Sequence, residues 1–200
     1  MASLLLLRHG QIDANRQGLW HGSTDSSLTW RGRRQARKTA RHIATAHNPL
    51  AAIYTSPLER CLHTARAVEK LVGITPEPVP DLREYAIGEW EGLPFSHLAE
   101  EHDFVGRALI DPDFSPPGGE SLAEVTGRMV AAIRNIHDRH GADERVLIVG
   151  HGAAMAVALG SLLNEDPSRW IEYPVANCSL TELMLSPSPY VNFFNSTQHL

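Results

Sequence analysis

The sequence has few cysteines, no long apolar run and no excess of positive charge. Its two cysteines, Cys61 and Cys178, lack metal-ligand spacing and suit a reducing cytoplasm better than a disulfide scaffold. No stretch approaches the ~18 apolar residues of a membrane span. The formal charge of −5 argues against binding to nucleic acid or to a membrane surface. We therefore expect a cytoplasmic protein with neither kind of partner.

The four leucines at residues 4–7 do not have the form of a signal peptide. Arg8 follows this run instead of preceding it, and the run is shorter than the usual apolar core of ~7–15 residues. We expect no leader there and interpret the run as a buried strand.

Eleven histidines raise the question of a metal site, but their spacing does not support one. The segment HLAEEH at 97–102 matches neither H-E-x-x-H nor H-x-x-E-H, the patterns of zinc-binding helices. A nucleotide-binding turn at 150–152 is also excluded, because Met155 stands where a third glycine is required. We expect neither a metal nor an organic cofactor.

Short apolar runs and capping signals predict alternating strands and helices. Strands are expected at residues 4–7, 51–56 and 145–150, with a further strand at 177–185 whose alternating pattern predicts one less buried face. One helix is expected from N-cap Thr29 to about residue 45. A second is expected from a capping box at Ser56, with Pro57 first in the helix, to residue 72. A third is expected from a capping box at Ser121 to about residue 139, and a fourth at 152–163.

This alternation predicts the fold class. Strands separated by helices of these lengths indicate an α/β fold with three layers, α/β/α, in which helices cover both faces of a mostly parallel central sheet. At 200 residues, one domain over 1–200 is expected. Residues 85–119 are interpreted as an insertion of loop and helix over the active site, and its end, 111–119, is too rich in proline and glycine for regular structure.

The residues best suited to chemistry follow the predicted strands. Arg8 and His9 follow the first strand, Arg60 lies shortly after the second, Glu84 follows a short extended stretch at 79–82, and His151 follows the strand at 145–150. Ligands of open parallel sheets bind at the carboxyl ends of the strands. Each residue taken alone is more often structural, but their convergence at one edge favours a functional site.

These residue types fit phosphoryl transfer without a metal. Two guanidinium groups suit an anion with several oxygens, and a neutral imidazole can attack phosphorus. A second imidazole, when protonated, can stabilise charge on the transferring oxygens. A glutamate can protonate the departing alcohol, and a helix beginning at Gly152 adds free backbone N–H groups.

Five segments occur in an order found in one enzyme family: RHG at 8–10, SPLERCLHTA at 56–65, LREYAIGEWEG at 82–92, PGGES at 117–121 and VGHG at 149–152. Through them the sequence resembles the histidine phosphatase superfamily, also called phosphoglycerate-mutase-like, over nearly its whole length. The resemblance implies that the family's fold is present and that His9 becomes phosphorylated. It implies that the phosphoryl group is bound by Arg8, Arg60 and His151, and that Glu84 donates the proton. It further implies contacts with substrate or phosphate by Asn15, His21, Gly22 and Gly152.

The sequence departs from the family pattern near the expected site. Ile12 replaces a common threonine, Cys61 stands where alanine is usual, and His63 stands where glutamine or glutamate is usual. His21 occupies a pocket position that another residue type often fills, which bears on substrate specificity.

The region after Glu84 favours a phosphatase over a mutase. A mutase must hold a second anionic group, but Arg107 is the only basic residue other than histidine in 85–127. The short EWEG segment at 89–92 also resembles the phosphatase branch. Mutase-type phosphoryl transfer and a non-catalytic relative that binds a phospho-ligand are the alternatives.

We therefore expect a phosphatase whose partner is a small phosphorylated metabolite; a homodimer is compatible with the sequence. Phe95, Phe104 and Phe114 lie in a segment with few charges. They indicate either a substrate with modest charge beyond its phosphate or local packing.

Overall fold

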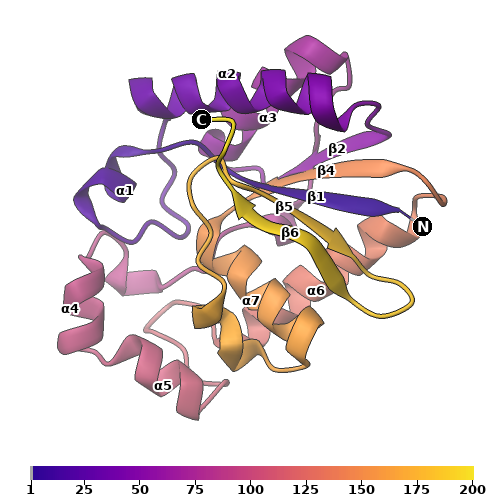
Figure 1. Ribbon diagram of the computed structural model, residues 1–200. Helices are drawn as coiled ribbons and strands as arrows, with labels where there is room; N and C mark the ends of the chain where they lie inside the picture. Colours follow the sequence, from indigo (N-terminus) through magenta and orange to yellow (C-terminus); the bar gives the residue numbers. More distant parts are fainter. Residues whose placement is uncertain (1) are drawn as a thin grey trace.

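The computed structural model describes residues 2–200, and the chain alternates between strands and helices (Figure 1). The strands are β1 Ser3–Arg8, β2 Ala52–Thr55, β3 Glu77–Pro78, β4 Arg145–Gly150, β5 Leu180–Met184 and β6 Tyr190–Ser196. The α-helices are α1 Asp13–Gln17, α2 Trp30–His42, α3 Glu59–Val72, α4 Phe95–Glu100, α5 Phe104–Ile110, α6 Leu122–Asp138 and α7 Gly152–Asn164. A π-helical turn covers Ile43–His47, and 3-10 helices cover Pro80–Leu82, Gly88–Trp90 and Pro167–Glu172.

The strands form one sheet in the order β3-β2-β4-β1-β5-β6. The first four strands in this order run parallel, and β5 is antiparallel to both of its neighbours, β1 and β6, so the predicted mostly parallel sheet is confirmed. Arg8 at the end of β1 aligns with Gly150 at the end of β4, and Thr55 of β2 aligns with Val149. The carboxyl ends of three strands therefore meet at one edge of the sheet.

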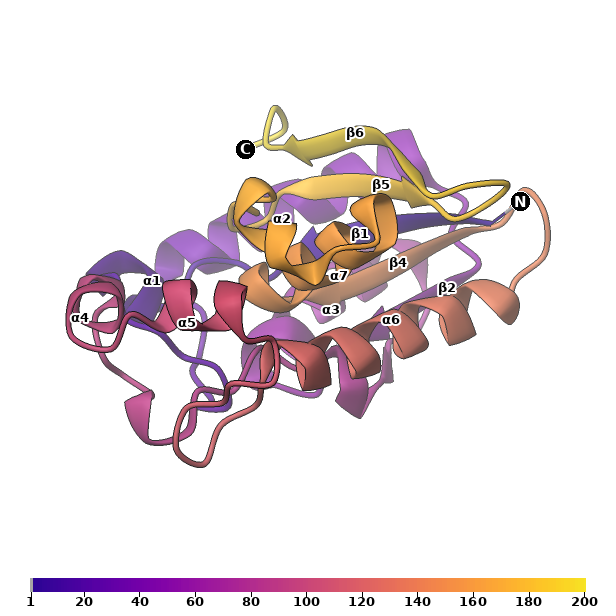
Figure 2. The same cartoon turned by 90° about the horizontal axis from the view of Figure 1, so that it is seen from below.

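Helices cover both faces of the sheet, which confirms the three predicted layers. Helices α2 and α3 lie on one face and α6 and α7 on the other, while α1, α4 and α5 lie beyond one end of the strands (Figures 1 and 2). Leu4 and Leu6 pack into the core with α6 and α7, and Leu5 and Leu7 pack into the core with α2 and α3. The four consecutive leucines thus reflect a strand whose alternate side chains are buried in two different cores.

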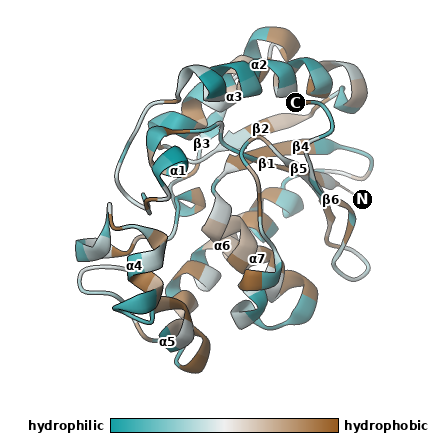
Figure 3. Cartoon of the chain, turned by 60° about the vertical axis from the view of Figure 1, so that its left-hand side comes forward, coloured by the Kyte–Doolittle hydropathy of each residue, from teal (hydrophilic) through white to brown (hydrophobic). Residues whose placement is uncertain are grey.

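Hydropathy follows these layers (Figure 3). Hydrophobic colours dominate the strands, while hydrophilic residues are prominent on α2. Helix α7 buries eight residues, seven of them with a side chain, because it lies between the sheet and the 3-10 helix that follows it. Its sequence is accordingly apolar on most of its faces.

Two details of the predicted strands are wrong. The expected extended stretch at 79–82 is a 3-10 turn, because Pro80 begins that turn and takes the chain out of the sheet after β3. The strand in 177–185 does not have one less buried face. Its polar residue Glu182 is buried and bonded to Arg145 (3.2 Å) and Asn192 (3.0 Å), so the alternating pattern marks paired polar residues.

The predicted capping box at Ser56 is also wrong. Helix α3 begins at Glu59, and Leu58 takes the N-cap position in an extended conformation without a side-chain cap. The Oγ atom of Ser56 instead lies 2.7 Å from Nε2 of His151. Asp25, from a distant loop, accepts a hydrogen bond from the Glu59 amide at 2.9 Å and so caps α3. A tertiary contact has replaced the local one.

The other helix signals are confirmed. Thr29 caps α2 by accepting from the Gly32 amide at 3.0 Å. At the start of α6, Ser121 and Glu124 form the reciprocal capping box. Gly73 ends α3 with φ of 75°, a left-handed conformation that glycine adopts without strain.

Candidate active site

The alignment of the strands places two histidines side by side. Because Arg8 pairs with Gly150, the next residues along β1 and β4, His9 and His151, emerge as neighbours at the sheet edge. Their ring centroids are 5.2 Å apart, with the rings inclined at 63°. The predicted convergence of these strand ends is therefore present in the structure.

The imidazole of His9 is held in one tautomer. Its Nδ1 atom lies 2.7 Å from the carbonyl oxygen of Gly10, which can only accept, so Nδ1 carries the proton and Nε2 keeps its lone pair. Burial is the main cause that holds the pKa of His9 well below its usual 6.5, and the charges of Arg8 and Arg60 act in the same direction. His9 is thus neutral at pH 7 and has a free ring nitrogen.

Arg8 has an unsatisfied donor beside His9. One of its terminal nitrogens donates to the carbonyl of Val175, but its buried Nε has no hydrogen-bond partner in the described chain. The guanidinium packs against the start of α7, where a Cβ on Gly152 would lie only 3.0 Å from Cζ of Arg8. A buried donor without a partner is unfavourable, so this group suits an anion held in front of it.

The carboxylate of Glu84 is held at the N-terminus of α7. Oε1 accepts from the amides of Tyr85 (2.9 Å) and Ala154 (2.7 Å), and Oε2 accepts from the amide of Ala153 at 3.2 Å. These amides and the positive end of the helix dipole favour a carboxyl group in this position. Oε2, with a single long bond, is the oxygen with spare capacity.

Arg60 and His151 lie one layer deeper and are fully buried. The Nε of Arg60 donates to Nδ1 of His151 at 3.2 Å, which leaves the proton of His151 on Nε2, facing Ser56. The terminal nitrogens of Arg60 donate to the carbonyls of Thr24 (2.8 Å), Gly22 (2.8 Å) and His21 (3.1 Å). Burial, followed by the charge of Arg60, holds the pKa of His151 well below 6.5.

A cavity of about 630 Å³ opens over His9. Six of the residues predicted for the site line it: Arg8, His9, Asn15, His21, Glu84 and Gly152. The other three, Arg60, His151 and Gly22, are buried close to it without reaching its wall. The structure therefore brings all nine together but in two layers, which sequence patterns do not distinguish.

Gly22 has a supporting position in this arrangement. Its carbonyl accepts from Arg60, and its amide donates to Glu91 at 2.8 Å. An added Cβ would lie 2.2 Å from the carbonyl oxygen of Tyr85, so only glycine fits there. Glu91, which sequence reasoning did not select, also accepts from the amides of Ser23 and Thr24.

The remaining cavity wall is mainly apolar. Phe95, Ala99 and Val105 come from the 85–119 segment, and Trp20 comes from the first loop. Of the three phenylalanines considered above, only Phe95 lines the cavity. Phe104 is fully buried in the core, and the ring of Phe114 packs under the guanidinium of Arg107 at 3.7 Å.

Sequence reasoning missed the wall formed by residues 170–175. The same cavity that the 85–119 segment lines is also lined by Trp170, Ile171, Tyr173, Pro174 and Val175. The aromatic residues and the proline in RWIEYPV were the available signal, because exposed loops rarely carry so many apolar side chains without a packing partner.

Asn177 was also missed, and no pattern in the sequence marks it. Its side-chain nitrogen donates to the backbone carbonyl of His9 (3.1 Å) and to Oδ1 of Asn15 (3.0 Å). Since Oδ1 of Asn15 also accepts from the amide of Ile12, the Asn15 nitrogen is the part of that side chain left to face a ligand.

Within residues 2–200, no group of three or more histidine, cysteine, aspartate or glutamate side chains is arranged to hold a metal ion. In the same residues, no helix combines the length and apolar character needed to cross a membrane.

A sequence model of the histidine phosphatase superfamily (branch 1) matches residues 4–192. The uncharacterized phosphatase PhoE of Bacillus subtilis is 30% identical over 84% of this chain and 80% of its own length. A probable phosphoglycerate mutase, GpmB of Photorhabdus laumondii, is 31% identical over 96% of this chain and 88% of its own length.

Among solved structures, the phosphoserine phosphatase of Entamoeba histolytica in complex with 3-phosphoglyceric acid has a TM-score of 0.88. It is 28% identical and covers 100% of both chains. The phosphoglycerate-mutase-like fold expected from the motifs is therefore confirmed.

Proposed function

Because the chain belongs to branch 1 of the histidine phosphatase superfamily, we propose that it hydrolyses small phosphomonoesters through a phosphohistidine at His9, without a metal. The observation that carries this proposal is the pairing of two unsatisfied groups in one cavity. His9, whose Nε2 is free, and Arg8, whose buried Nε has no partner in the described chain, line the same cavity. One is a nucleophile and the other binds the anion it attacks.

In the first step, Nε2 of His9 forms a bond to phosphorus while the bond from phosphorus to the ester oxygen breaks. Glu84, protonated on Oε2, gives its proton to the departing alcohol. In the second step, the Glu84 carboxylate takes a proton from water, the water oxygen attacks phosphorus, and the bond to Nε2 breaks. Phosphate leaves and Glu84 is protonated again.

Arg60 and His151 support this chemistry from below. The guanidinium of Arg60 is held by backbone carbonyls and by His151, so its positive charge is fixed beneath the site. A fixed charge in a buried position stabilises a transferring phosphoryl group without reorganisation. We propose that His151 positions Arg60 and His9. We also propose that Arg60 and His151 together polarise the phosphoryl group.

The cavity favours an ester whose alcohol part is uncharged and apolar. Among its lining residues in the described chain, Arg8 is the one arginine or lysine, and it faces the phosphoryl position. Trp20, Phe95 and Tyr173 offer aromatic surface to the rest of the substrate. A mutase needs a second cationic contact for its second anionic group, and this wall offers none, so we favour a phosphatase.

Trapping the intermediate tests the mechanism. After mixing with p-nitrophenyl phosphate and an alkaline quench, we expect an acid-labile, base-stable phosphate on His9 by mass spectrometry. His9→Ala should lose both this signal and turnover, whereas the exposed control His97→Ala should keep both. Turnover that survives in His9→Ala within tenfold of the parent would refute the phosphohistidine.

Two further assays test Glu84 and the metal. Glu84→Gln should slow an alkyl phosphate far more than p-nitrophenyl phosphate, whose leaving group departs without protonation. Equal losses on both substrates would exclude Glu84 as the acid. EDTA should leave turnover unchanged, and an EDTA-sensitive rate that zinc or magnesium restores would contradict metal independence.

Substrate preference tests the cavity. We expect 1-naphthyl phosphate to have a higher kcat/KM than phosphoserine or 3-phosphoglycerate. Ala99→Lys places a cation on the exposed side of the cavity wall and should raise kcat/KM for 3-phosphoglycerate relative to 1-naphthyl phosphate. Interconversion of phosphoglycerates faster than phosphate release would favour the mutase alternative.

A further inference from the structure

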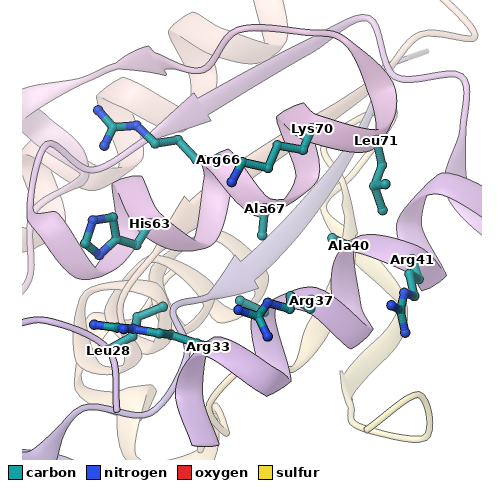
Figure 4. A pocket seen from close by; sticks show the side chains of 11 residues that line it. Leu28, Arg33, Arg37, Ala40, Arg41, His63, Arg66, Ala67, Lys70 and Leu71 are labelled. Carbon is teal, nitrogen blue, oxygen red and sulfur yellow. The ribbon is translucent and has the colours of Figure 1, made fainter. Parts of the chain in front are cut away.

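A second cavity, of about 680 Å³, lies between α2 and α3 on the outer side of the sheet (Figure 4). Five cationic side chains line it: Arg33, Arg37 and Arg41 from α2, and Arg66 and Lys70 from α3. The helices face each other through small or apolar residues, among them Ala40, Ala67 and Leu71. None of the residues lining the cavity over His9 takes part in this second one. We call it the basic groove.

The cations of the basic groove are not balanced within the protein. In residues 2–200, none of the five forms an ion pair with a carboxylate, and no acidic residue lines the groove. Helix α2 carries six arginines and lysines and no acid, although the whole chain has a formal charge of −5. Positive charge is therefore concentrated in the basic groove, although the chain as a whole has a net negative charge.

The spacing of these cations is unfavourable for the helices alone. Arg33, Arg37 and Arg41 follow one another at intervals of four residues, and so do Arg66 and Lys70. Like charges at this interval lie on the same helix face and destabilise a helix. Repulsion between these cations destabilises helices α2 and α3, and an anion bound among them would remove that repulsion.

We propose that the basic groove binds a small polyanion that carries several phosphate groups. Four of the five cations are arginines, whose planar fork matches phosphate oxygens. Arg33 and Arg41 are separated by eight residues, or about 12 Å along the helix, so one phosphate can reach only part of the set. The volume is in the range of small-molecule cavities, and the apolar floor can hold an uncharged part of the ligand.

A small ligand fits better than a nucleic acid. The unpaired cations of the groove span only two to three helical turns, and a long polyanion would continue onto a chain of net negative charge. Proteins that track nucleic acid extend their basic surface along the backbone. The confined groove therefore points to a compact anion.

Titration calorimetry with inorganic tripolyphosphate tests this proposal. We expect the intact protein to bind it, and inorganic phosphate to bind at least tenfold more weakly. Arg37→Glu with Arg41→Glu should weaken tripolyphosphate binding at least tenfold and leave hydrolysis of p-nitrophenyl phosphate unchanged. Arg31→Glu with Arg34→Glu is the matched control, because it makes the same charge change on α2 outside the groove and should alter binding less than threefold.

Four outcomes would overturn the proposal. The first is that tripolyphosphate does not bind the intact protein. The second is an equal loss of binding in the two double variants, which would indicate a diffuse electrostatic effect. Loss of binding in Arg8→Ala would place tripolyphosphate over His9 instead. Tighter binding of a single-stranded oligonucleotide, reduced by both double variants, would indicate a nucleic-acid surface. Thermal unfolding of each variant confirms that it is folded, so weakened binding reports on the groove.

Discussion

Replacing Gly152 with alanine should lower activity and raise stability at the same time. The new Cβ would lie 3.0 Å from Cζ and 3.1 Å from Nε of Arg8. Ordinary contacts begin at 3.4 Å, so the guanidinium must move by at least about 0.4 Å. Gly152 is the first residue of α7 and its φ is not left-handed, so alanine suits the backbone there.

The two effects have opposite signs for separate reasons. Alanine reduces the conformational entropy of the unfolded chain, which raises the free energy of unfolding by about 0.4–1 kcal/mol where the backbone is compatible. Displacement of Arg8 moves the donor for phosphate, and misplacement by about 1 Å can lower a rate about 100-fold. We therefore expect kcat/KM to fall by about tenfold to 100-fold while Tm rises.

The assay combines hydrolysis of p-nitrophenyl phosphate with thermal unfolding. Gly127→Ala is the control, because this exposed position in α6 has no atom within 4 Å of an added Cβ. It should raise Tm and leave kcat/KM unchanged. In an Arg8→Ala background, Gly152→Ala should lower kcat/KM by less than threefold further. A loss as large as that in the parent would refute displacement of Arg8 as the cause.

Three further predictions concern His9, His151 and the residues that support them. The lowered pKa values of His9 and His151 mean that the unfolded chain binds more protons, so their contribution to stability is present above about pH 6.5 and should be lost progressively as the pH falls below 6.5 in denaturant titrations. A flat profile would contradict neutral buried rings. Asp25→Ala removes the cap of α3 and should lower the free energy of unfolding by about 1 kcal/mol, whereas an unchanged Tm would show that the cap is dispensable. Glu91→Gln should lower both Tm and kcat/KM, because the amides of residues 22–24, whose loop also holds Arg60 through its carbonyls, lose a carboxylate acceptor. A change in Tm alone would show that this loop does not affect catalysis.

The fold could be predicted largely from residues that act locally. Four consecutive leucines require burial on both faces, and Ser121 with Glu124 closes a helix end within four residues. The convergence of the candidate site residues followed from one topological rule, since parallel strands have their carboxyl ends at the same edge of the sheet. These signals succeed because each depends on few neighbours.

Some of the errors arose where a distant residue replaced a local partner. Ser56 has the form of an N-cap, but its hydroxyl bonds to His151 and Asp25 caps α3 instead. The cavity wall at 170–175 lies beside the 85–119 segment only after the chain has folded. Neither contact has a spacing or periodicity that a sequence pattern could report.

Depth is the property that most changes the chemistry of the site. A motif places Arg60 and His151 with His9, but it does not say that they lie beneath the cavity wall. Burial keeps both imidazoles neutral, while three backbone carbonyls hold the charge of Arg60 in place. The proposed role of His9 as a nucleophile at neutral pH depends on two separate features: burial lowers its pKa, and the carbonyl of Gly10 holds its proton on Nδ1. A site with the same residues exposed to water would lose the fixed tautomer and much of the electrostatic stabilisation.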